Sequence, residues 1–179
     1  IYMKYLCDLT GRCLNVALLL LGLAHAGAVL AHQPSLCHAD EKMVFSCMTT
    51  NRKMVSVCAS SNLKERPAKG YIAYRFGTQK KMELQLHIHD PANQDSPLYY
   101  HYFRPQTDRN QLWFNAGGAT YTVFTNYDGT ETPSSVAGVS VDFGGKRSVS
   151  IACKGGYEAN WWVIDGVVAC SDEIFNSCN

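Results

Sequence analysis

Two histidines separated by one residue, His87 and His89, are the clearest candidates for metal chemistry in the sequence, and Asp90 follows them directly. Residues i and i+2 of a strand point to the same face, so both imidazoles could bind one zinc or copper ion. His101 could then be a third ligand and Asp90 a fourth. Histidines at this spacing also occur on exposed strands without a metal, and no pattern brings His101 close. We therefore expect no cofactor.

Aromatic side chains offer a second kind of chemistry, because their rings stack on the apolar faces of sugars and anchor protein interfaces. The candidates are Tyr71, Tyr74, Tyr99, Tyr100, Tyr102, Trp113, Trp161 and Trp162. Alternating aromatic residues are also what a β core requires. The stretch 98–103 is aromatic on both faces, and the adjacent tryptophans would point to opposite faces of a strand. We predict the ligand-binding residues to be Tyr99, His101, Phe103, Trp161 and Trp162.

Signatures of catalysis are missing from the sequence. The run Gly138–Asp142 lacks the second glycine of a nucleophile elbow, and Gly144–Lys146 lacks the spacing of a phosphate-binding loop. No motif pairs Glu41, Glu83 or Asp90 with a second carboxylate for glycoside hydrolysis. We expect a protein without enzymatic activity, with an active site built from scattered residues as the alternative.

The first 31 residues have the composition of an export signal. Lys4 and Arg12 precede the apolar run Val16–Leu23, and small residues follow, so that cleavage is expected after Ala26 or Ala31. A membrane-spanning helix is the alternative, since the apolar stretch is nearly long enough, but it contains polar residues and has no basic flank after it. We predict residues 1–31 to be a signal peptide and 32–179 to be a single periplasmic or secreted β domain.

The number of cysteines and the net charge after residue 31 are both consistent with an exported protein. Six of the eight cysteines remain after residue 31: Cys37, Cys47, Cys58, Cys153, Cys170 and Cys178. An even number of cysteines in an exported protein predicts disulfides. A disulfide of the last cysteine, Cys178, would tie down the C-terminal tail. The remaining chain would have 14 acidic and 14 basic residues. This neutral balance lacks the basic face that nucleic acid requires, and we expect no membrane span after the signal is removed.

One disulfide can be proposed from hairpin geometry. If the first hairpin loop is centred between Arg52 and Lys53, residues whose numbers sum to 105 face each other. Cys47 and Cys58 would then be cross-strand neighbours within bridging distance. The alternative is a bulge that shifts the register, so that each cysteine reaches another strand. The sequence has no Cys-x-x-Cys pair, so disulfides are favoured over a zinc site.

The elements that position these residues are predicted to be strands. After the apolar N-terminal run, alternation and β-branched or aromatic residues dominate, and turn-forming pairs such as Asp128-Gly129 separate them. The predicted strands are Lys42–Thr49, Met54–Ala59, Gly70–Phe76, Met82–His89, Leu98–Arg104, Gln111–Asn115, Thr120–Asn126, Ala137–Phe143, Ser148–Cys153 and Trp161–Ala169. Polar loops are expected at Ser60–Lys69, Pro91–Pro97 and Pro105–Asn110. We predict an all-β fold, an antiparallel β-sandwich or barrel of about eight to ten short strands, stabilised by disulfides.

A series of short motifs runs along the chain: EKMVFSC at 41–47, VSVCAS at 55–60, GYIAYRFG at 70–77, GGATYTVFTN at 117–126, GVSV at 138–141, Gly145-Lys146 and CKG at 153–155. This series resembles a group of small exported proteins of Gram-negative bacteria that have no assigned function. The resemblance covers residues 41–155. It implies an exported, β-rich protein and supplies no catalytic residues.

The expected function is binding. Small disulfide-bonded β proteins of the envelope include lysozyme inhibitors and immunity proteins against wall-degrading toxins, which is an analogy of architecture. We expect an exported, non-catalytic binding protein of this inhibitor class, with a protein ligand favoured over a sugar and the Ser60–Lys69 loop and Tyr99–Phe103 as recognition elements. The alternative is a carbohydrate-binding module that uses Trp113, Trp161 or Trp162, and the third hypothesis is an enzyme.

Overall fold

The computed structural model describes residues 34–65, 69–89, 96–145 and 147–171. The predicted signal peptide, Asp90 and Cys178 lie outside these ranges. The elements are β1 (Glu41–Thr49), β2 (Met54–Ser60), β3 (Ile72–Thr78), β4 (Lys81–His89), β5 (Leu98–Arg104), β6 (Thr107–Ala116), β7 (Ala119–Asp128), β8 (Ser134–Asp142), β9 (Ser148–Ala159), the 3-10 helix η1 (Trp161–Val163) and β10 (Ala169–Cys170). No helix in the described part is long and apolar enough to cross a bilayer.

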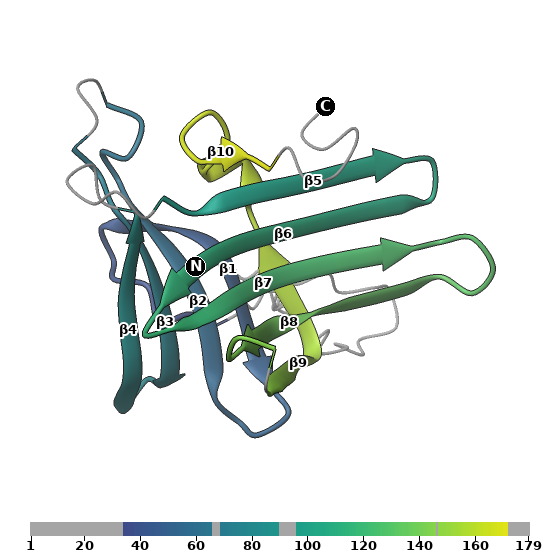
Figure 1. The fold of residues 1–179 in the computed structure, drawn as a ribbon, viewed down its shortest axis with the longest axis horizontal. Helices are drawn as coiled ribbons and strands as arrows, with labels where there is room; N and C mark the ends of the chain where they lie inside the picture. The colour runs from purple at the N-terminus through teal and green to yellow at the C-terminus, as the bar shows by residue number, and fades with distance from the viewer. Residues whose placement is uncertain (1–33, 66–68, 90–95, 146, 172–179) are drawn as a thin grey trace, which may run out of the picture. The chain divides into compact units, whose positions relative to one another are not determined.

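All the strands in the described ranges belong to one ten-stranded sheet with the order β10-β5-β6-β7-β8-β9-β1-β2-β3-β4. β10 pairs in parallel with β5, and every other pair is antiparallel. Figure 1 shows β5–β8 lying at a steep angle to β1–β4, so the sheet curls into a half-barrel. The predicted disulfide-stabilised, antiparallel all-β fold is confirmed.

Strand β9 joins the two groups of strands and carries the bend. Its first part pairs with β8, and its later residues pair with β1. Between Cys153 and Tyr157 the register slips against β1, and Gly155 and Gly156 there have φ of 79° and 111°. Glycine adopts positive φ without a steric penalty, and extra residues of this kind bend a strand. The glycines thus let one strand serve two differently oriented groups.

The apolar core lies on the inner face of the curled sheet. Strands β1–β3 contribute fully buried residues such as Val44, Val57 and Ile72, and β6–β8 contribute Leu112 and Val139. Aromatic rings fill the space between the two groups of strands. Those with centroid distances below 6 Å are Phe45–Trp161, Tyr74–Phe114, Tyr74–Tyr121, Tyr99–Trp161 and Phe114–Tyr121. Each buried ring adds apolar area and contributes its packing energy to the core.

The predicted Cys47–Cys58 disulfide is wrong. The structure contains Cys37–Cys58 and Cys47–Cys153 instead. The first hairpin turns earlier in the chain than expected: it is centred on Asn51, since Met48 pairs with Met54 and the Thr49 N–H donates to the Lys53 carbonyl at 2.7 Å. Cys47 therefore pairs with Val55, and Cys58, three residues further along β2, points to the opposite face. Cys170 is also disulfide-bonded.

Two other local predictions are wrong. The stretch 105–110 is not a loop, because Gln106 adopts a φ of 67° in a tight turn and β6 begins at Thr107. The stretch 161–169 is not a strand: η1 and turns occupy most of it, and only Ala169 and Cys170 form β10. Apolar composition alone does not distinguish a strand from a packed turn, and here Trp161, Val163 and Ile164 are buried within the turn.

Candidate functional site

On the inner face of β5, β6 and β7, the pairing of the strands arranges side chains in rows that change from apolar to polar. Directly paired residues of neighbouring strands point to the same face, and every second residue repeats it. Three rows result: Tyr99–Leu112–Val123, then His101–Asn110–Thr125, then Phe103–Asp108–Tyr127. The first row belongs to the core, whereas the second is polar and the third reaches solvent. The sheet therefore carries polar side chains where its inner face leaves the core.

The segment that follows β9 packs against this surface. Asn160 anchors it by donating its N–H to the Val44 carbonyl at 2.6 Å. The Trp161 ring is buried against Tyr99, with centroids 5.7 Å apart, and its Nε1–H donates to Thr125 Oγ1 at 3.1 Å. The next residue, Trp162, is 66% exposed. The short 3-10 helix thus fixes one tryptophan in the core and presents the other to solvent.

A cavity of about 690 Å³ lies between this segment and the sheet. Its aromatic lining consists of Tyr99, Trp161 and Trp162, and its polar lining consists of His101, Asp108, Asn110 and Asp165. Its volume falls within the range of known small-molecule sites. Four of the five residues predicted to bind a ligand therefore line one cavity.

The polar lining is internally hydrogen-bonded. Tyr99 donates its hydroxyl to Asn110 Oδ1, Asn110 donates from Nδ2 to Asp108 Oδ1 at 2.8 Å, and His101 Nε2 lies 3.1 Å from the same oxygen. Burial raises the pKa of the Tyr99 hydroxyl, and the negative charges of Asp108 and Asp165 raise it further. Tyr99 therefore stays protonated and acts as a donor, which holds the chain of side chains in one arrangement.

The fifth predicted residue, Phe103, is beside the cavity rather than in its lining. Its ring centroid is 6.3 Å from that of His101, and 68% of the residue is exposed. The sequence does not single out Asp108 and Asn110, which fall in the predicted loop 105–110, or Asp165, which falls in a predicted strand. The alternation of Asp108, Asn110 and Leu112 would have been the signal that β6 extends this far.

Other predicted candidates lie elsewhere. Trp113 is on the outer face of the sheet, since it pairs with Leu98, and its Nε1–H donates to Gln111 Oε1. Tyr74 is buried in the core. Tyr71 stacks on His87 and donates its hydroxyl to Glu41. The structure therefore removes Trp113 from the set of tryptophans that could bind one ligand together.

The histidines considered as metal ligands are not brought together. His87 and His89 are both on β4, and His101 is on β5. Among the residues that the structure describes, the one group of three close ligand atoms is formed by Cys37, Glu41 and Cys58. The two sulfurs of that group form a disulfide, so they are not available as thiolate ligands.

A second hollow adjoins the first across the turn at Asp165 and Gly166. Its volume is about 370 Å³. Its lining also includes Val167, the strand residue His89 and the loop residues Leu63, Lys64 and Glu65. Lys64 donates from Nζ to the Trp162 carbonyl at 2.8 Å. Part of the loop predicted to take part in recognition is thereby attached to the segment that carries the exposed tryptophan.

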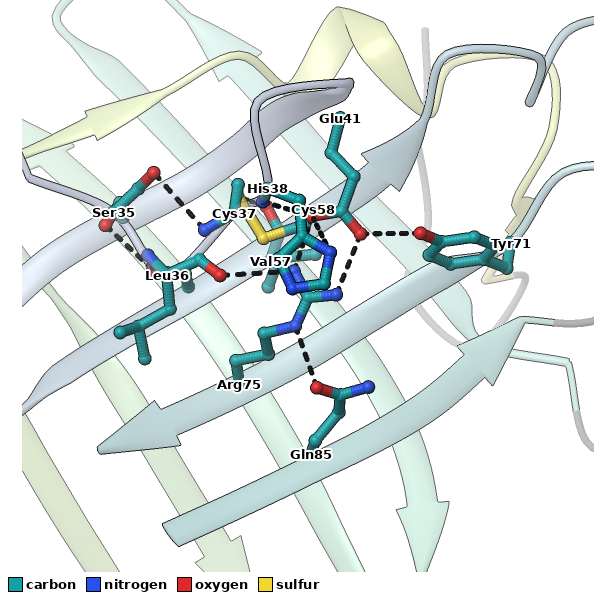
Figure 2. Close-up of polar contacts among 12 residues, drawn as sticks. Ser35, Leu36, Cys37, His38, Glu41, Val57, Cys58, Tyr71, Arg75 and Gln85 are labelled. Atoms are coloured by element: carbon teal, nitrogen blue, oxygen red, sulfur yellow. Dashed lines mark hydrogen bonds and ion pairs between the residues drawn. A yellow bond between two sulfur atoms is a disulfide. The ribbon is translucent and has the colours of Figure 1, made fainter. Parts of the chain in front are cut away.

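A buried ion pair that the sequence did not suggest holds the start of the domain (Figure 2). Arg75 binds Glu41 through two hydrogen bonds of 2.5 and 2.8 Å, and both side chains are at most 1% exposed. Arg75 also donates to the Leu36 carbonyl and to Gln85. Burial alone would raise the pKa of Glu41, but hydrogen bonds from Arg75, the His38 N–H and Tyr71 lower it to about 2. This cluster fixes residues 35–41 on the sheet beside the Cys37–Cys58 disulfide.

The chain matches no protein-family model, no curated protein and no solved structure.

Proposed function

We propose that this chain is an exported, non-catalytic binding protein that holds a saccharide in the cavity between β5, β6 and η1. The observation that carries the proposal is the arrangement of its walls. Aromatic rings of Tyr99, Trp161 and Trp162 line the same cavity as the hydrogen-bonded side chains of His101, Asp108 and Asn110. Sugars need both surfaces, because their rings have apolar C–H faces and polar hydroxyl edges.

Pre-organisation supports a binding role. Trp161 and Tyr99 are fixed by stacking and by hydrogen bonds to Thr125 and Asn110, so little rotamer freedom remains to be lost on binding. Trp162 is exposed beside them and offers an uncovered indole ring. Disulfide bonds, which persist in oxidising compartments, support the predicted export.

The experiment is a glycan-array screen of residues 32–179, followed by titration calorimetry with the best oligosaccharide. Removing the exposed indole in Trp162→Ala should weaken binding by about tenfold, since a stacked aromatic pair contributes about 0.5–1.5 kcal/mol beyond the apolar area that it buries. Phe143→Ala is the matched control, because Phe143 is also exposed, at 42%, but does not line the cavity. Equal affinity of the two variants, or no saccharide bound at all, would overturn the proposal. Release of reducing ends from a bound oligosaccharide would replace it with an enzymatic function.

A protein ligand of the lysozyme or wall-degrading toxin class is the second candidate. The observation in its favour is that two large exposed aromatic residues, Phe103 and Trp162, flank the cavity. Exposed rings of this kind are typical anchors of interfaces. Inhibition of a lysozyme panel by the mature domain, lost in Phe103→Ala, would support this candidate. The cavity favours the saccharide, because a protein inhibitor needs a protruding surface more than a hollow one.

A further inference from the structure

We infer that the saccharide bound in this cavity carries free amino groups, so that the natural ligand class is a cationic amino sugar. This inference rests on the proposed function and narrows it to one chemistry. Three features of the cavity carry it: the charge of its lining, the balance of donors and acceptors, and the position of an exposed indole ring beside a carboxylate.

The charge of the lining is negative. Among the described residues around the cavity, Asp108 and Asp165 are acids, and none is a lysine or an arginine. His101 is the titratable base, and its Nε2 is already within 3.1 Å of Asp108. Lys64 lines the adjoining hollow instead and donates its ammonium group to the Trp162 carbonyl. A cleft lined by one sign of charge concentrates ligands of the opposite sign.

Three side-chain donors of the lining are already engaged within the protein. The Tyr99 hydroxyl donates to Asn110, one Asn110 N–H donates to Asp108, and the Trp161 indole N–H donates to Thr125. The carboxylate oxygens of Asp108 and Asp165 only accept, and each has room for more than one hydrogen bond. The two carboxylates therefore remain as acceptors beside the exposed Trp162 indole, and a ligand that donates hydrogen bonds to them is favoured. An ammonium group has three donors and no acceptor.

Asp165 and Trp162 are the residues placed to receive the charged group. Asp165 is exposed and, within the described residues, forms no ion pair. Only two residues separate it from Trp162, whose exposed ring belongs to the same lining. A cation over an indole face is stabilised by about 0.5–1 kcal/mol at exposed sites, and a neighbouring carboxylate adds charge pairing. A sugar with an ammonium group can satisfy both while its ring stacks on the aromatic wall.

The test compares three oligosaccharides of equal length and linkage by titration calorimetry: a glucosamine oligomer, its fully N-acetylated form and the corresponding glucose oligomer. The measurements are made at a pH at which the free amine is protonated. The glucosamine oligomer should bind at least roughly fivefold more tightly than the other two, as expected for one exposed charge pair together with cation–π contact. The preference of the protein for the glucosamine oligomer over the other two should fall when salt is raised from about 0.05 to 0.5 M, because salt screens exposed charges.

Matched variants separate charge from shape. Asp165→Asn keeps the volume of the side chain and should lower the affinity for the glucosamine oligomer by roughly two- to fivefold, with no change for the glucose oligomer. The control is Asp142→Asn, which has the same change of charge at a residue outside the cavity lining. Equal affinity for all three oligosaccharides would overturn this inference and leave the proposed function intact. Absence of binding to any of them, on the array as well, would overturn both.

Discussion

The buried pair formed by Glu41 and Arg75 gives the sharpest prediction for stability. Glu41→Gln removes the negative charge and keeps the shape, which leaves the Arg75 guanidinium buried without a counter-charge. Loss of one partner from a buried pair costs about 3–5 kcal/mol. The pKa of Glu41 gives a second value, because its decrease from 4.5 to about 2 corresponds to about 3 kcal/mol of stability at neutral pH.

The pH dependence has a definite sign. A carboxyl whose folded-state pKa is depressed stabilises the fold above its unfolded pKa, and this contribution is lost as the pH falls through the folded pKa. The native protein should therefore lose about 3 kcal/mol from this group between about pH 5 and pH 2. The Glu41→Gln variant has no carboxyl group at this position that could gain a proton. The difference in unfolding free energy between the two proteins should shrink across that interval.

Urea unfolding of the oxidised protein, followed by tryptophan fluorescence at several pH values, measures this difference. Glu83→Gln is the matched control, because Glu83 forms an ion pair with Lys53 at 2.6 Å in which both side chains are 33% exposed. Exposed pairs contribute about 1 kcal/mol at most. If Glu41→Gln and Glu83→Gln lose the same small amount, or if the Glu41→Gln difference does not change with pH, the reasoning about burial is refuted.

Three further predictions concern the fold and the cavity. Peptide mapping under non-reducing conditions should recover Cys37 joined to Cys58 and Cys47 joined to Cys153, and a Cys47–Cys58 peptide would contradict the observed register. Gly138→Ala should lower unfolding free energy by roughly 1–3 kcal/mol in urea titration, because the added Cβ would lie 2.4 Å from the Ile151 carbonyl oxygen; an unchanged midpoint would show that β8 and β9 do not approach so closely. Tyr99→Phe should lower the unfolding free energy by roughly 1–3 kcal/mol, because Asn110, which is only 5% exposed, loses a hydrogen-bond donor. No loss in the same urea titration would show that this hydrogen bond does not stabilise the fold.

The strands could be predicted because their signal is local. Alternation around Val123 specifies both the element and its inner face. The aromatic run Leu98–Arg104 specifies a strand but no inner face, and the structure keeps the predicted bounds of β5. The disulfides could not be predicted in the same way. The first hairpin turn is held by backbone and side-chain hydrogen bonds between Thr49 and Lys53, and a shift of this turn changes which cysteines face each other.

The candidate site could be predicted only in part, because part of it depends on contacts between residues far apart in the sequence. Tyr99 and His101 stand out as residue types on a strand, and so do the adjacent tryptophans. Asp108 and Asp165 are ordinary surface acids in the sequence, and they become part of a site only through the strand pairing of β6 and the turn after η1. Long-range pairing of this kind leaves no local pattern in the residues themselves.

The most direct test of saccharide binding uses the three tryptophans of the chain as internal probes. Each indole N–H gives a separate NMR signal, which can be assigned with Trp→Phe variants. Addition of the best saccharide should shift the signals of Trp161 and Trp162, which line the cavity, and should leave Trp113, on the outer face, unchanged. Three unchanged signals, or a shift confined to Trp113, would contradict the account.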